Sequence, residues 1–200
     1  MKTKILITLT LLTALTTLCS CSKEVGRCDL TEAQKQVIPY EKGQVISFTD
    51  SAGHTVDFSI TERKSEWYKE YYGGGFIEDH VMYRKEEVTL KNKSNNFEIH
   101  FWISAGECFG DGHNNSWLAI KIPPYSIYFE LFSCDTKGNF LSDRDSIHDS
   151  IEINGNVYFD VVETNFVHSN YHKDLQFFYN KVYGILQINI DGENFLTLKN

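Results

Sequence analysis

Apolar and polar residues alternate along several short segments of this chain. Residues 55–60, 97–103 and 118–122 each place an apolar side chain at every second position. Such a period of two is typical of a β-strand with one buried face. Residues 126–134 are aliphatic or aromatic on both faces and are therefore predicted to form a central strand.

Turn residues separate these segments. Asn154-Gly155 and Asp191-Gly192 each join two apolar runs, which predicts tight hairpins because both turn positions favour a positive φ. A loop at residues 50–53 similarly joins residues 44–48 to the strand that follows. About ten strands at this spacing, without a long helix, predict an antiparallel all-β sandwich or a curved half-barrel.

The amino terminus has the three parts of a bacterial export signal. Lys2 and Lys4 precede an apolar run from Ile5 to Leu18, broken only by threonines. This run is shorter than the roughly 20 apolar residues that a membrane-spanning helix needs. The following Leu18-Cys19-Ser20-Cys21 resembles the lipobox of bacterial lipoproteins. We therefore expect residues 1–20 to be a signal peptide and Cys21 to carry lipid; the alternative is an ordinary secreted protein.

The pattern of polar and apolar residues changes near Gly43. Residues 21–43 are polar and are predicted to form a lipidated tether, in which residues 30–37 make a short helix ended by Pro39. Residues 44–200 are predicted to form a single all-β domain. The expected location is the bacterial cell envelope, at the outer membrane, with the lipid on Cys21 as the membrane contact.

Two segments carry a family resemblance. Residues 39–48 (PYEKGQVISF) and 178–195, which contain FYNKVYGIL and then Asp191-Gly192, resemble small lipoproteins of the Bacteroidota. The resemblance implies the envelope location and the β fold, and it implies no activity. Three tripeptides that begin at Asp50, Asp145 and Asp149 also resemble the O-glycosylation sequon of that phylum.

Charge narrows the class of partner. The chain has 27 acidic and 19 basic side chains, a formal net charge of −8. Without Lys2 and Lys4 of the signal peptide, 17 basic side chains face the same 27 acidic ones, a net charge of −10. Nucleic acid is therefore excluded as an expected partner, because phosphate contacts need clustered Lys and Arg. Neutral or basic partners are favoured.

Three cysteines remain once Cys19 is removed and Cys21 is lipidated. A Cys108–Cys134 disulfide is predicted because both lie inside the β domain and the envelope is oxidising. The alternative is that both are free buried thiols. Together with Cys28, their spacings match no zinc-ligand pattern, so no metal site or cofactor is predicted.

Two loop segments contain candidate binding residues. Trp67, Tyr68, Tyr71 and Tyr72 precede a triglycine, and their spacing suits one face of a helix or an aromatic platform on a loop. They can alternatively cover the open end of the β core. The glycine-rich loop at residues 106–115 contains His113 and is either a pocket or calcium-binding loop, or a plain hairpin loop.

No catalytic motif is evident. His168 and His172 are four residues apart, but the glutamate of a metalloprotease motif is absent, and the acidic loop around His148 is expected to be solvated. The chain has no G-x-S-x-G sequence. We therefore predict a non-catalytic binding module for a glycan or an envelope protein. The alternatives are an inhibitor or immunity lipoprotein for a basic enzyme or toxin, and a hydrolase with a carboxylate pair.

Overall fold

The computed structural model describes residues 22–72, 79–95, 97–108, 115–122, 128–141, 146–168 and 173–199. Thirteen strands and one short helix form in these ranges. They are β1 (Glu24–Cys28), α2 (Glu32–Lys35), β2 (Val45–Asp50), β3 (Thr55–Tyr72), β4 (Asp79–Asn92), β5 (Glu98–Ala105), β6 (Ser116–Lys121), β7 (Tyr128–Cys134), β8 (Phe140–Leu141), β9 (Ser146–Ile153), β10 (Asn156–His168), β11 (Lys173–Asn180), β12 (Gly184–Ile190) and β13 (Glu193–Leu198). No helix in the described ranges is long and apolar enough to cross a membrane.

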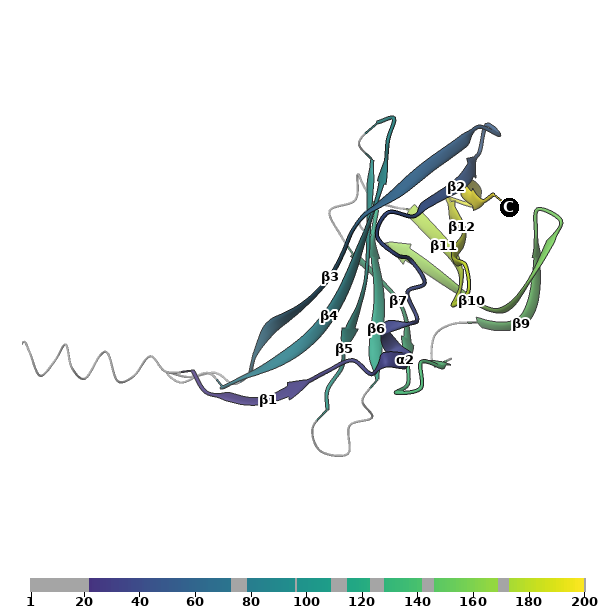
Figure 1. The fold of residues 1–200 in the computed structure, drawn as a ribbon. Coiled ribbons are helices and arrows are strands. Elements are labelled where there is room, and N and C mark those ends of the chain that lie inside the picture. Colours follow the sequence, from purple (N-terminus) through teal and green to yellow (C-terminus); the bar gives the residue numbers. More distant parts are fainter. Residues whose placement is uncertain are drawn as a thin grey trace, which may run out of the picture.

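The strands form one antiparallel sheet with the order β8-β7-β6-β5-β4-β3-β2-β13-β12-β11-β10-β9. After β1 and α2, the chain enters the middle of this order at β2, runs outward to β8, and crosses to the other edge at β9. It then returns to β13, which pairs with β2. The sheet is curved and unclosed, so its two halves face each other (Figure 1). The predicted all-β class is therefore confirmed.

Both predicted tight hairpins are present. Asn154 and Gly155 have φ values of 51° and 76°, and Asp191 and Gly192 have values of 54° and 79°. The strands on either side of each turn pair in antiparallel fashion. Local sequence determined these turns because few residues tolerate two successive positive φ angles.

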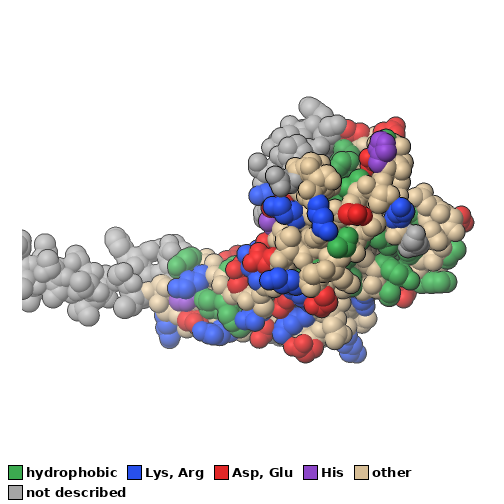
Figure 2. Space-filling view, turned by 45° about the horizontal axis from the view of Figure 1, so that its top comes forward, with side chains coloured by type: hydrophobic (Ala, Val, Ile, Leu, Met, Phe, Trp, Pro, Cys, Tyr) green, Lys and Arg blue, Asp and Glu red, His purple; other side chains and the backbone are tan. Residues whose placement is uncertain are grey.

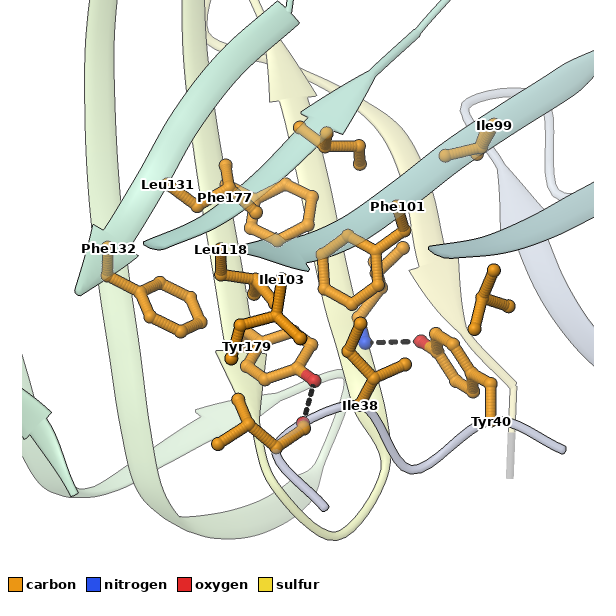
Figure 3. Packing of buried hydrophobic residues seen from close by; sticks show 14 of the residues in the cluster. Ile38, Tyr40, Ile99, Phe101, Ile103, Leu118, Leu131, Phe132, Phe177 and Tyr179 are labelled. Atoms are coloured by element: carbon orange, nitrogen blue, oxygen red, sulfur yellow. Dashed lines mark hydrogen bonds between the residues drawn. The ribbon is translucent and has the colours of Figure 1, made fainter. Parts of the chain in front are cut away.

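The main core lies between the two halves of the sheet. Figure 3 shows Phe101 and Ile103 of β5 beside Phe177 and Tyr179 of β11. The Tyr179 hydroxyl donates a hydrogen bond to the Val37 carbonyl. Burial raises the pKa of this tyrosine well above its usual range, so the hydroxyl stays protonated as a donor.

The prediction that residues 21–43 form a tether is wrong for residues 22–43, which the structure describes. Five side chains of this segment are buried in the core, namely Cys28, Leu30, Val37, Ile38 and Tyr40. The Tyr40 hydroxyl accepts a hydrogen bond from the Ile185 amide at 2.5 Å (Figure 3). The segment has a polar composition overall, but these spaced apolar residues pack it against the sheet.

Polar side chains also hold the same segment in place. Thr31 and Gln34 form a capping box that starts α2, the helix predicted within residues 30–37. Arg63 of β3 donates to the Tyr40 carbonyl at 2.7 Å and contacts the Glu41 carboxylate at 2.9 Å. The folded unit therefore includes the described chain from Ser22 onward, and β1 pairs in parallel with β4.

Candidate functional site

A groove of about 660 Å³ lies on the sheet face opposite the core, across β3 to β7. Strand register explains its composition, because directly opposed residues share one face. Tyr68 lies opposite Tyr83, and Trp102 lies opposite Ala119. The lining residues are Glu66, Tyr68, Glu70, Tyr72, Tyr83, Lys85, Trp102, Ser104, Ala105, Glu107, Trp117, Ala119 and Glu130. Five aromatic rings and four carboxylates thus face one open hollow.

Three tyrosines make a rigid wall at the β3 side. The rings of Tyr68 and Tyr83 stack with centroids 5.6 Å apart. The Tyr72 hydroxyl hydrogen-bonds the Tyr83 hydroxyl, and the Tyr68 hydroxyl hydrogen-bonds Ser104. Burial raises the pKa of Tyr68 and of Tyr83, so both hydroxyls remain neutral and can donate or accept.

Two tryptophans make the other apolar surfaces. The Lys85 ammonium lies 4.8 Å from the Trp102 ring centroid, a cation–π contact that holds both side chains. Trp117 is 40% exposed and presents a free ring surface. A Cβ atom on Gly106 would lie 2.0 Å from the Asn115 carbonyl oxygen and 2.6 Å from the Trp117 ring, so only glycine allows both to pack at this position.

Glu87 positions Lys85 beside the groove. Its carboxylate lies 2.6 Å from the Lys85 ammonium and 3.3 Å from the His100 ring. Burial by itself would raise the pKa of Glu87, but the hydrogen bond and charge of Lys85, with Lys64 and His100, outweigh it and lower the pKa.

The lowered pKa of Glu87 predicts a pH dependence of stability. A depressed folded pKa contributes stability above the ordinary value of 4.5, and that stability is lost as pH falls through the folded value. On acidification from pH 7 to pH 3, the free energy of unfolding of Glu87→Gln should therefore fall by about 1 kcal/mol less than that of the native chain. Urea unfolding at both pH values measures this. Glu152→Gln, at an exposed position, is the control, and an equal loss in both variants would contradict the assignment.

Three groove carboxylates stay available to a ligand. Within the described part of the chain, the side chains of Glu70, Glu107 and Glu130 form no ion pair or hydrogen bond. Glu66 lies 4.0 Å from the Lys64 ammonium. Free carboxylates accept hydrogen bonds from hydroxyl groups or pair with cations.

The structure splits the four predicted aromatic residues between two faces. Residues 67–72 continue β3 as a strand, which corrects the predicted helix or loop platform. Tyr68 and Tyr72 line the groove, whereas Trp67 and Tyr71 lie on the opposite face because side chains alternate along a strand. Trp67 lies between the guanidinium groups of Arg27 and Arg84, 5.4 and 5.3 Å from its ring centroid.

The predicted Cys108–Cys134 disulfide is wrong. Cys108 bonds to Cys28 at the end of β1, and this bridge ties β1 to the groove rim beside Glu107. Cys134 is a free buried thiol whose Sγ lies 3.1 Å from the Ser116 hydroxyl. Burial raises its pKa to about 11. The parallel pairing of β1 with β4 brings Cys28 to Cys108, and no local pattern reveals that pairing.

Some predicted residues lie outside the described part of the chain, namely Cys21, His113, His172 and the triglycine at residues 73–75. His148 is described, and its ring lies 2.8 Å from the Glu163 carboxylate. Among the described residues, no group of three or more His, Cys, Asp or Glu side chains lies close enough to hold a metal ion.

Sequence reasoning missed Trp102, Trp117 and the Lys85–Glu87 pair. The signal was present for Trp102, because the alternation of residues 97–103 puts it on the face away from the core. That alternation does not show that β3, β4 and β6 add their aromatic and acidic residues to the same face. The strand order, which the sequence does not give, creates the groove.

A second hollow of about 660 Å³ lies near the β9 edge of the sheet. Its lining includes the exposed apolar side chains of Ile147, Val157, Phe159, Val182 and Tyr183. Asp160 and Lys181 are its charged residues. This second hollow therefore has one carboxylate, whereas the groove on β3 to β7 has four beside its aromatic rings.

The fold and the groove define the chain as an all-β protein with an open, aromatic, carboxylate-lined surface site. No protein-family model matches the chain, and no curated protein or solved structure shows significant similarity to it.

Proposed function

We propose that this protein is a non-catalytic, envelope-anchored lipoprotein that binds a glycan in the groove on β3 to β7. The observation that carries the proposal is the presence, in one open groove, of five aromatic rings, of which those of Tyr72 and Trp117 are exposed, beside three carboxylates that have no partner in the described chain. Aromatic faces pack against the apolar faces of sugar rings, and carboxylates accept hydrogen bonds from sugar hydroxyls. The anchor is the lipid predicted on Cys21.

Substitution of Trp117 tests the groove. We expect Trp117→Ala to weaken glycan binding about tenfold, because the variant loses both the apolar area of the ring and its stacking contact, together about 1.4 kcal/mol. A glycan array would identify the ligand, and calorimetry would measure the affinity. Phe159→Ala is the matched control, because Phe159 is 66% exposed and lies in the other hollow.

Two results would contradict the assignment. One is equal affinity in the native chain and in Trp117→Ala, and the other is an equal loss in the Phe159→Ala control. A change of binding in Trp67→Ala without a change in Trp117→Ala would place the ligand on the opposite face of β3.

A basic protein segment is the second candidate ligand. The free carboxylates of Glu70, Glu107 and Glu130 favour it, as does the acidic net charge. Such a partner would suit an inhibitor or immunity lipoprotein. Salt separates the two ligands, because the affinity for a basic partner falls steeply with ionic strength, whereas sugar stacking changes little.

A further inference from the structure

The chain directly after Cys21 is fixed to the folded sheet. The Ser22 hydroxyl lies 2.9 Å from the His80 ring, and the His80 amide donates to the Lys23 carbonyl at 3.0 Å. From Glu24 onward, β1 pairs with β4. One residue spans at most about 3.6 Å. A lipid on Cys21 would therefore hold this end of β3 and β4 directly at the bilayer surface, and this step rests on the anchor of the proposed function.

At this end of β3 and β4, three rows of side chains lie on the sheet face opposite the groove. Strand register puts Trp67 beside Arg84, and Lys69 beside Met82 and Arg27. It also puts Tyr71 beside His80 and Glu24. We name these eight residues the anchor face. Figure 2 shows Lys, Arg and His side chains among hydrophobic ones where the described chain meets the grey N-terminal residues.

The anchor face has the opposite charge to the chain as a whole. It carries three cations, Arg27, Lys69 and Arg84, in a chain with a formal net charge of −8. Its one carboxylate, Glu24, already pairs with Arg27 at 2.5 Å. Within the described part of the chain, Lys69 and Arg84 form no ion pair. This face can therefore accept additional anionic groups.

The aromatic residues of this face suit the same surroundings. Tyr71 is 53% exposed, and Trp67 is half-buried between two guanidinium groups. Trp and Tyr concentrate at the headgroup level of membranes, where an apolar ring and a polar tip are both satisfied. Basic residues near the surface add attraction to anionic lipids.

We propose that the anchor face lies against the anionic headgroups of the lipid bilayer. Lys69 and Arg84 face the lipid phosphates, and the rings of Trp67 and Tyr71 lie at the headgroup level. The groove is on the other face of the same strands, so this orientation directs it away from the bilayer and keeps it open to solvent.

Fluorescence quenching tests the orientation. The lipidated chain, purified from bacterial membranes, is incorporated into vesicles of brominated phosphatidylglycerol, which quenches tryptophan near the lipid. We expect native tryptophan emission to be partly quenched, and Trp67→Phe to remove that quenching. Trp117→Phe is the matched control and should keep it, because Trp117 lies on the groove face. Emission that is unquenched, or that stays quenched in Trp67→Phe, would overturn the proposal.

Charge dependence tests the choice of anionic lipid. We expect Lys69→Gln to reduce the ratio of docked to undocked chain about fivefold in phosphatidylglycerol vesicles, the effect of one cation at a membrane surface. Lys93→Gln, beyond the far end of β4, removes the same charge and should leave the ratio unchanged. Equal quenching in phosphatidylcholine and phosphatidylglycerol would overturn the assignment to anionic headgroups.

Failure of this proposal is distinguishable from failure of the proposed function. Flotation of the chain with vesicles reports the lipid anchor, quenching of Trp67 reports the docked face, and glycan affinity of Trp117→Ala reports the groove. A chain that does not float with vesicles overturns the docking proposal and the lipid anchor of the proposed function, and it leaves the glycan-binding groove to its own test.

Discussion

Replacing both Cys28 and Cys108 by serine is expected to lower the free energy of unfolding by about 4.5 kcal/mol. The disulfide links residues 80 positions apart, so its loss restores a large loop-closure entropy to the unfolded chain. It also releases β1 from the groove rim, because Cys108 adjoins the lining residue Glu107. Urea unfolding under oxidising conditions measures the loss.

A reducing agent provides the internal comparison for this prediction. It should destabilise the native chain by a similar amount and leave the double variant unchanged. Cys134→Ala is the matched control, because it removes a buried thiol outside the bridge and should cost about 1 kcal/mol. If reduction left native stability unaltered, or if Cys134→Ala cost as much as the double variant, the Cys28–Cys108 bridge would not be the main covalent support.

Gly184→Ala is expected to cost about 3 kcal/mol, for two independent reasons. Gly184 has a φ of +77°, which disfavours any residue with a Cβ atom. An added Cβ would also lie 2.2 Å from the Tyr40 hydroxyl oxygen. Tyr40 is buried and cannot move away without losing the hydrogen bond from the Ile185 amide. Thermal or urea unfolding measures the cost.

Gly192→Ala separates the two causes. Gly192 has nearly the same φ, +79°, but no atom lies within 4 Å of its added Cβ. It should therefore cost only about 1 kcal/mol, the backbone contribution alone. Equal costs at the two positions would show that contact with Tyr40 is unimportant, and that the N-terminal segment is packed more loosely than the burial of Tyr40 indicates.

These stability predictions bear on the function because the same N-terminal segment connects the anchor to the sheet. Tyr40 fixes the segment to β12, and Cys28 fixes it to the groove rim. A lipid on Cys21 would therefore act on a segment that is fixed to the sheet. In the arrangement we propose, the two faces of β3 take separate roles, with Trp67 and Tyr71 toward lipid and Tyr68 and Tyr72 toward the ligand.

The sequence singled out two residues that line the groove, Tyr68 and Tyr72, but it did not show on which face of the sheet each aromatic residue lies. The aromatic residues of 67–72 stand out in composition, and two of them do line the groove. Both a helix and a strand put Trp67 and Tyr71 on one face. Only a strand puts Tyr68 and Tyr72 on the opposite face. The segment lacks an apolar alternation, because this part of β3 extends past the core and has polar residues on both faces.

The sequence by itself determined the local elements: the alternating strands, the hairpins at Asn154-Gly155 and Asp191-Gly192, and the capped helix after Thr31. Each depends on backbone preferences and burial periods that act within a few residues. It also supplies the acidic charge and the lipid anchor predicted at Cys21.

Only the tertiary structure decided the non-local features. These are the parallel pairing of β1 with β4, the Cys28–Cys108 bridge, the burial of Tyr40 against Gly184, and the groove that joins Trp102 and Trp117 to β3. Each depends on contacts between residues far apart in the chain. Because such contacts follow from strand order and sheet curvature, no local pattern in the sequence specifies them.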